Sequence, residues 1–500
     1  MAPDTAAARR RWFALGVLVL PVLIISMDAT VLGFAVPQLS EALEPSSSQL
    51  LWIIDIYSFV LAGLLVTMGA LGDRIGRRRL LTIGAGAFSV ASLVSAFSTS
   101  PEMLIGARAL LGIAGATLMP STLSLIRNIF EDDHERQTAI ALWAASFAVG
   151  TALGPIVGGF LLGHFWWGSV FLAGVPVTGA LLVAAPRLVP ESKDPQPGAF
   201  DLTSAALSML TMIPSVYSVK MFAEHGPTAS AAVALVVGVV SGVLFVRRQR
   251  RLTDPMIDVT LFRVPKFRMA VSGNLLACFG FAGTLFIVTQ YLQLVSGMSP
   301  LRAGLQLLPA LVASMAMMAA APVAARRFGP FAVIAVGLTM GAVGFALLTQ
   351  LGTDSVPLVT VAVLVLNGGL GMAMSVAVDG ILASVPPARA GAGASVSETA
   401  NELGIALGTA LLGSIMTAVY RSRMELLDAV PDDALRRARE TLGAAIVASE
   451  ELSGAAGAAL ESGARSAFVE GVHTAAIVAS AATFVVAVWA AVTRLRDGGD

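Results

Sequence analysis

Fourteen long hydrophobic stretches divide this chain and leave little sequence between them. Each has about 18 or more residues, enough for a helix to cross the ~30 Å hydrocarbon core of a bilayer. Only 13% of the 500 residues are charged, compared with about 25% in soluble domains. We therefore expect an all-α polytopic membrane protein with fourteen transmembrane helices. The stretches are approximately 12–36, 49–70, 80–99, 103–127, 137–160, 166–186, 202–221, 229–246, 269–295, 304–324, 331–350, 357–384, 393–420 and 470–493.

The distribution of lysine and arginine predicts the orientation of these helices. Most of the 32 basic residues lie in the two tails and in every second loop. Because short cytoplasmic loops carry an excess of Lys and Arg, both termini are expected in the cytoplasm. The long segment 421–468 then lies outside, where its Ala, Glu and Arg content favours a soluble helical hairpin.

Two polar breaks divide the hydrophobic stretches into groups of six, two and six. The first is the proline-rich stretch 190–197 and the second is the basic segment 247–268. We therefore predict an N-terminal six-helix bundle at 12–187, a two-helix insert at 200–246 and a C-terminal six-helix bundle at 268–495. The last of these contains the extracellular segment 421–468.

The sequence lacks the residue patterns that metal binding and nucleotide binding require. The chain has one cysteine, Cys278, and four scattered histidines, so it shows no metal-ligand pattern. It also lacks the G-x-x-x-x-G-K-[ST] string that cradles nucleotide phosphates. We expect no metal, no cofactor, no enzymatic activity and no nucleic-acid partner. Transport would be driven by an ion gradient or by a separate subunit.

Five carboxylic acids fall within or at the ends of the predicted spans: Asp28, Asp55, Asp379, Glu398 and Glu402. Acidic residues inside a membrane are costly and usually serve a function, so each is a candidate site for protons or cations. Glu398 and Glu402 are one helical turn apart, which places them on one face and forms an inner cluster with Asp379. For Asp55 and Glu402 the alternative is a solvated or capping position near the interface.

One basic residue, Arg108, also lies inside a predicted span, and packing alone does not explain it. Burial without a partner raises the pKa of a carboxyl group, whereas a nearby cation lowers it. A buried carboxylate can therefore exchange a proton for a cationic compound.

Aromatic residues near these charges are candidates for the wall of a cavity that binds flat lipophilic cations. The alternative is that they face lipid or neighbouring helices, as aromatic residues in membrane proteins commonly do. The candidates are Phe34, Trp52, Tyr57, Trp143, Phe147 and Phe281.

A short glycine- and arginine-rich loop, 69–81, joins the second and third predicted spans. Its glycines permit a tight turn and its arginines suit anionic lipid headgroups. Any membrane protein can carry such a loop on its cytoplasmic side, but the spacing here resembles the signature loop of the major facilitator superfamily at nearly every position. The matching residues are Gly69, Asp73, Arg74, Gly76, Arg77 and Arg78.

The fifth predicted span contains a run of small residues around a proline: Gly150, Gly154, Pro155, Gly158 and Gly159. Small residues at a spacing of four are a common helix-packing signal, and proline kinks a helix. Gly-Pro followed by Gly-Gly at this place resembles the antiporter motif of drug exporters in that superfamily.

The likeness to fourteen-span drug:proton antiporters extends over the whole chain, including Asp28-Ala29-Thr30, the buried Arg108 and the string 397–404. The chain departs from the pattern at Gly33 and at 321–331, where an expected acid is missing. The resemblance implies two six-helix bundles plus two inserted helices. It also implies proton-coupled export of lipophilic cations such as quaternary ammonium compounds, dyes and fluoroquinolones across the plasma (inner) membrane, with membrane lipid around the protein. The alternatives are export of one endogenous metabolite or antibiotic, and a sensor that does not transport.

Overall fold

The computed structural model describes residues 5–193, 201–252, 255, 257, 259–384, 390–425, 431–452 and 454–497. These residues form helices and connecting turns, and no β-strand occurs among them. The N-terminal part contains α1 (Thr5–Leu43), α2 (Ser47–Ile75), α3 (Arg77–Ala96), α4 (Pro101–Ile129), α5 (Asp133–His164), α6 (Ser169–Leu172) and α7 (Gly174–Leu188). Then follow α8 (Leu202–His225) and α9 (Ala229–Gln249). The remainder contains a 3-10 turn (Leu261–Arg263), α10 (Pro265–Gln290), a π-helical turn (Tyr291–Val295), α11 (Pro300–Phe328), α12 (Pro330–Leu348), α13 (Val356–Ala383), α14 (Ala390–Met424), α15 (Asp432–Ala438), α16 (Leu442–Glu451) and α17 (Ala455–Asp497).

The expectation of an all-α polytopic membrane protein is confirmed. Thirteen helical segments in the described part of the chain are long and apolar enough to cross a membrane. In α5, a further apolar segment, Val149–His164, is consistent with a fourteenth span. The stretch expected at 166–186 differs in being broken into α6 and α7. The last helix begins at Ala455, well before the expected start of its span at 470.

Helix starts follow local capping chemistry. Ser46 and Gln49 form a reciprocal capping box at the start of α2, with the Ser46 side chain accepting from the Gln49 backbone N–H. The Ser100 and Ser299 side chains cap α4 and α11 by accepting from the backbone N–H groups of Met103 and Arg302, and each serine lies just before a proline. Proline suits the first helical position because its missing N–H would have no partner there.

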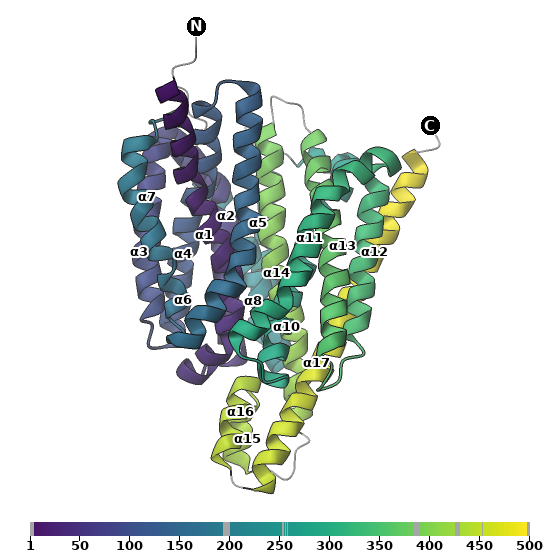
Figure 1. Cartoon of the computed structure of the whole chain (residues 1–500). Coiled ribbons are helices and arrows are strands. Elements are labelled where there is room, and N and C mark those ends of the chain that lie inside the picture. The colour runs from purple at the N-terminus through teal and green to yellow at the C-terminus, as the bar shows by residue number, and fades with distance from the viewer. Residues whose placement is uncertain are drawn as a thin grey trace.

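The helices form two bundles with matching internal packing (Figure 1). In the first, α1 packs against α5 and α2 against α4; in the second, α10 packs against α14 and α11 against α13. The junctions α2–α3 and α11–α12 occupy equivalent places. Each turns at a glycine with positive φ, Gly76 at +109° and Gly329 at +88°, a conformation that favours glycine. The bundles contact each other through α2 with α14 and through α5 with α11.

The start of α1 and the end of α17 lie at one end of the molecule, which we call the terminal end, and α15 and α16 project from the opposite end (Figure 1). We call these two short helices the cap. The cap is continuous with the membrane helices, because α14 runs on to Met424 and α17 begins at Ala455. Glu440, between α15 and α16, links both bundles: its carboxylate accepts from the Ser47 backbone N–H of α2 at 3.4 Å and binds Arg421 of α14 at 2.9 Å.

Candidate functional site: a cavity lined by acidic residues

A cavity of about 450 Å³ lies between the two bundles. Its size falls within the range of pockets that hold drug-sized ligands, roughly 300–1,000 Å³. The wall is built from α1, α2, α4 and α5 of the first bundle and from α10, α11, α13 and α14 of the second. A compound bound here therefore contacts both bundles at once.

The bundles approach each other closely on the cap side of the cavity. A Cβ added at Gly159 of α5 would lie 2.6 Å from Leu301 Cα, and one at Gly413 of α14 would lie 2.6 Å from a Leu51 methyl carbon. On the other side, Asp379 lines the cavity close to the terminal end of α13, and its residue is exposed. Solvent therefore reaches this part of the cavity wall.

Four of the five carboxylic acids identified in the sequence line this one cavity: Asp55, Asp379, Glu398 and Glu402. Asp55 and Glu402 are deeply buried, at 1% and 5% exposure, so neither is the solvated interfacial residue that the sequence left open. They come from opposite bundles, on α2 and α14. The fifth acid, Asp28, is buried beside the cavity and is not among its lining residues.

Asp28 is paired with Arg108. The Arg108 Nη1 donates to Asp28 Oδ2 at 2.5 Å, and the Nε of the same side chain donates to the backbone carbonyl of Ile53 at 3.1 Å. The guanidinium carbon lies 4.6 Å from the centre of the Tyr57 ring, a cation–π arrangement. One arginine thus joins α4 to α1 and α2. Arg108 is itself 2% exposed and contributes to the cavity wall.

Polar partners position the two glutamates on α14. Ser58 of the first bundle is a hydrogen-bond partner of Glu402. Asn401 is a partner of Glu398, and its Oδ1 accepts from Asn274 Nδ2 at 2.7 Å. Sequence reasoning did not identify the two asparagines as site residues. The position of Asn401, three residues after Glu398 and hence on the same helix face, was the available signal.

The rest of the cavity wall is mainly apolar, aromatic and sulfur-rich, with several serine and threonine residues among the lining. Tyr57 and three more of the proposed aromatic residues line it, namely Trp143, Phe147 and Phe281. Two do not: Phe34 is fully buried in the hydrophobic core, and Trp52 packs on Phe59 and Tyr217 instead. The sequence analysis missed the four methionines Met119, Met315, Met318 and Met374. Methionine adapts its shape to different ligands, so this lining suits a site for varied compounds.

The small residues of α5 bring this helix close to α1 and to the other bundle. A Cβ at Gly154 would overlap the Thr30 side chain, and Gly150 and Gly158 face α1 in a similar way. Gly159 faces Leu301, and Pro155 O would lie 2.6 Å from a Cβ at Gly304. The motif therefore makes both the α1–α5 packing and the α5–α11 contact between the bundles.

The loop at the α2–α3 junction is held by the segment after α7. The Arg78 backbone N–H donates to Glu191 Oε1 at 3.0 Å, and the Arg77 backbone N–H donates to Ser192 O at 2.8 Å. The Glu191 carboxylate thus meets the start of α3, where backbone N–H groups favour an anion. Gly69 is close to Pro120 of α4, and Arg74 is exposed. The side chain of Asp73 lies outside the described part of the structure.

The sequence profile of the Major Facilitator Superfamily matches residues 18–409. The chain belongs to the major facilitator superfamily. It is 50% identical to the multidrug efflux pump LfrA of Mycolicibacterium smegmatis, over 95% of both chains. It is 35% identical to the methyl viologen resistance protein SmvA of Salmonella typhimurium, over 92% of this chain and 93% of that one.

A solved structure of this facilitator fold agrees with the architecture. The crystal structure of a bacterial homologue of the human lysosomal transporter Spinster superposes with a TM-score of 0.66 at 16% identity, covering 97% of this chain and 98% of that one. This likeness concerns the fold alone. Together with the family, it identifies this facilitator as a multi-pass membrane transporter and not an enzyme.

Proposed function

We propose that the protein exports lipophilic cations across the plasma membrane in exchange for protons. The observation that carries this proposal is that Asp55, Glu398 and Glu402 line one shared cavity together with aromatic and methionine side chains. An apolar wall favours a flat lipophilic body, and a carboxylate favours a positive charge on it. The same carboxylate holds a proton when the cation is absent.

Exchange requires that cation and proton compete for the same groups. In the cation-bound state the carboxylates are ionised and the bound charge compensates them. After release of the cation, a buried carboxylate without that partner takes up a proton. Glu402 and its partner Ser58 belong to opposite bundles, so protonation of Glu402 changes an interaction across the interface that must open and close during transport.

The Arg108–Asp28 pair has a separate place in this scheme. Arg108 contributes to the cavity wall, but the pair joins helices of one bundle only, since α1 and α4 both belong to the first bundle. We infer that it fixes the positive charge of Arg108 near Asp55 and Glu402, and that this charge limits how many of the acids carry protons at one time. Asp379, exposed at the terminal end, is the first acid that a cation from that side meets.

The relatives support the substrate class. One is named as a multidrug efflux pump and another as a methyl viologen resistance protein. Methyl viologen is a flat dication, and a cavity with several carboxylates can compensate two charges.

The excess of basic residues at the terminal end supports a cytoplasmic position for that end. The cap then lies outside, and export runs from the terminal end to the cap end.

Inverted membrane vesicles provide the test, because their lumen corresponds to the outside of the cell. With an acidic lumen, wild-type vesicles should accumulate ethidium, and nigericin should abolish the accumulation by collapsing the pH gradient. An anionic dye of similar size should not accumulate. Matched vesicles that carry Glu398→Gln should lose ethidium transport. Accumulation that persists without a pH gradient would contradict proton coupling. Absence of transport for every cation tried would favour the dedicated exporter or the sensor.

A further inference from the structure

The inserted helix α8 packs on the seam between the two bundles. It contacts α2 of the first bundle and α14 of the second, and it runs behind α14 in the view of Figure 1. Ser208 of α8 donates a hydrogen bond to the Gly63 carbonyl at 3.4 Å, and a Cβ at Gly63 would lie only 2.6 Å from Met209. The fit of α8 against α2 is therefore close.

An apolar cluster fills the place where α2, α8 and α14 meet. Its centre is formed by Phe59 of α2, Val216 of α8, and Ala406 and Ala410 of α14, all 3% exposed or less. Other side chains from the three helices pack around it, namely Trp52, Met212, Ile213 and Leu407. The central residues of this cluster do not belong to the main hydrophobic core, and Leu407 packs against both.

The cluster adjoins the two most buried acids of the cavity. Asp55 precedes Phe59 by one helical turn on α2, and Glu402 precedes Ala406 by one turn on α14. Residues four apart lie on the same helix face, so each acid lies next to a cluster residue on its own helix. Because α2 and α14 line the cavity and α8 contacts both of them, the wall between the cavity and α8 is one helix thick. Asp55 and Glu402 lie at its cavity face, and α8 lies against it from outside.

Helix α9 covers α8 in turn and faces the surroundings. Its Gly238 and Gly242 lie against Ser215 and Thr211 of α8. The opposite side of α9 is exposed and strongly apolar, as expected for a surface in contact with acyl chains. The exposed residues there include Val233, Val236, Val239, Val240, Val243 and Leu244.

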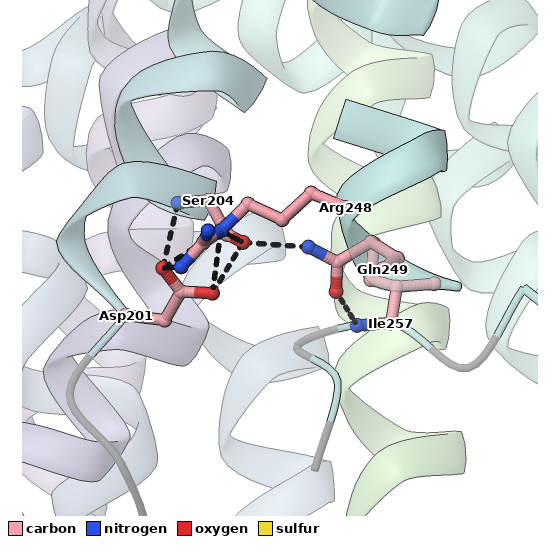
Figure 2. Close-up of polar contacts among 5 residues, drawn as sticks. All are labelled: Asp201, Ser204, Arg248, Gln249 and Ile257. Atoms are coloured by element: carbon pink, nitrogen blue, oxygen red, sulfur yellow. Dashed lines mark hydrogen bonds and ion pairs between the residues drawn. The ribbon is translucent and has the colours of Figure 1, made fainter. Parts of the chain in front are cut away.

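A polar clamp at the terminal end ties the two inserted helices together, as Figure 2 shows. Asp201 caps α8 through the Ser204 backbone N–H at 3.0 Å and binds Arg248 of α9 at 2.9 Å. Gln249, which is buried, donates to Ser204 Oγ at 2.6 Å and accepts from the Ile257 backbone N–H at 3.1 Å. The clamp holds α8 and α9 as one unit.

We propose that α8 is a lateral seal, which separates Asp55 and Glu402 from the bilayer where the two bundles meet. The proposal deepens the proposed function, because a seal matters for acids that carry protons. Water entering between α2 and α14 would give these acids a route for protons that bypasses the cavity. The insert therefore keeps proton exchange confined to the cavity.

Chemical modification by dicyclohexylcarbodiimide tests the seal, because this lipid-soluble reagent attacks carboxyl groups that it can reach from the bilayer. The seal variant combines Met212→Ala, Ile213→Ala and Val216→Ala on the inner face of α8. The matched control combines Val236→Ala, Val240→Ala and Val243→Ala on the outer face of α9. Each variant loses atoms from three apolar side chains, and peptide mass spectrometry gives the rate of modification at Glu402 and Asp55.

The seal variant should be modified several-fold faster than wild type at Glu402, and the control should match wild type. The single change Val216→Ala, which disturbs the fold less, should shift the rate in the same direction. Equal rates in wild type and both α8 variants would overturn the proposal, as would an equal increase in the α9 control. Modification of the carboxyl groups by the reagent does not depend on transport activity, so it tests the seal independently of the proposed function. Wild-type vesicles that lack ethidium-driven proton flux would therefore refute the proposed function separately.

Discussion

Arg108 and Asp28 form a buried ion pair, with 2.5 Å between Arg108 Nη1 and Asp28 Oδ2. The arginine also donates to the Ile53 carbonyl and lies over the Tyr57 ring. We infer that this ion pair holds the positive charge of Arg108 in a constant position beside the acids that exchange protons. The geometry depends on the planar guanidinium, which reaches two acceptors from one side chain.

Replacing this arginine with lysine should therefore impair transport. Arg108→Lys keeps the charge but cannot reproduce both hydrogen bonds. A loss of roughly 1.5–3 kcal/mol for a charge-assisted hydrogen bond corresponds to at least about a tenfold lower rate. Initial rates of ethidium efflux measure the effect, and Arg302→Lys, at an exposed position, is the control. A normal rate for Arg108→Lys would show that only the charge matters.

Removing the other partner should be more damaging. Asp28→Asn leaves the Arg108 guanidinium buried without its counterion, which costs about 3–5 kcal/mol in comparable pairs. We expect ethidium efflux to be abolished and the thermal unfolding temperature to fall, with the protein still present in the membrane. An unchanged efflux rate would exclude Asp28 as a required carboxylate.

The glycines of α5 provide a matched pair. Gly154→Ala places a methyl group onto the Thr30 side chain, whereas a methyl group at Gly163 in the same helix would meet no atom within 4 Å. Overpacking of this kind costs about 1–3 kcal/mol. We expect Gly154→Ala to reduce drug-driven proton flux and Gly163→Ala to leave it intact. Pro155→Ala, which restores a backbone donor, should have an intermediate effect. Equal proton flux in all three variants would show that the motif serves only helix packing and not proton coupling.

The two junction glycines, Gly76 and Gly329, allow the effect of backbone strain to be distinguished from the effect of the contact with Glu191. Alanine at either place is strained by the positive φ, but only at Gly76 would the new Cβ also lie 2.8 Å from the Glu191 carboxyl carbon. Gly76→Ala should therefore slow transport more than Gly329→Ala, without altering the range of compounds exported. Rates for several cations measure both effects. A greater loss in Gly329→Ala would mean that the contact with Glu191 is unimportant.

The clamp on the inserted helices has a defined pH dependence. Partial burial raises the pKa of Asp201, whereas hydrogen bonds from Arg248 and Ser204 lower it. The lowering is larger, so the pKa of Asp201 lies below its ordinary value. The clamp therefore stabilises the fold fully above the ordinary carboxyl pKa near 4 and loses this effect as the pH falls through the lowered value. Asp201→Asn should cost about 1 kcal/mol at neutral pH and nothing at strongly acidic pH. Thermal unfolding at both pH values tests this, and an equal cost at both would contradict it.

The sequence predicted the helices well because a run of apolar residues is a local signal with few interpretations. It also identified the charged residues, since an acid inside such a run stands out. It did not pair Asp28 with Arg108, which lie 80 positions apart, although opposite buried charges were a hint. The methionines and Asn274 were missed because nothing local distinguishes a side chain that faces a cavity from one that faces a neighbouring helix. The sequence also predicted helices in the segment that contains the cap. The early start of α17 depends on packing between distant segments, which periodicity does not record.

Proton release on cation binding tests the central claim most directly. Purified protein in weakly buffered solution is titrated with ethidium, and a pH-sensitive dye reports released protons while ethidium fluorescence reports binding. The account predicts that wild type releases protons in proportion to the ethidium bound. The double variant Glu398→Gln, Glu402→Gln should bind more weakly and release fewer protons. Tight binding of ethidium by wild type with no proton release would contradict the exchange of cation for proton at these carboxylates.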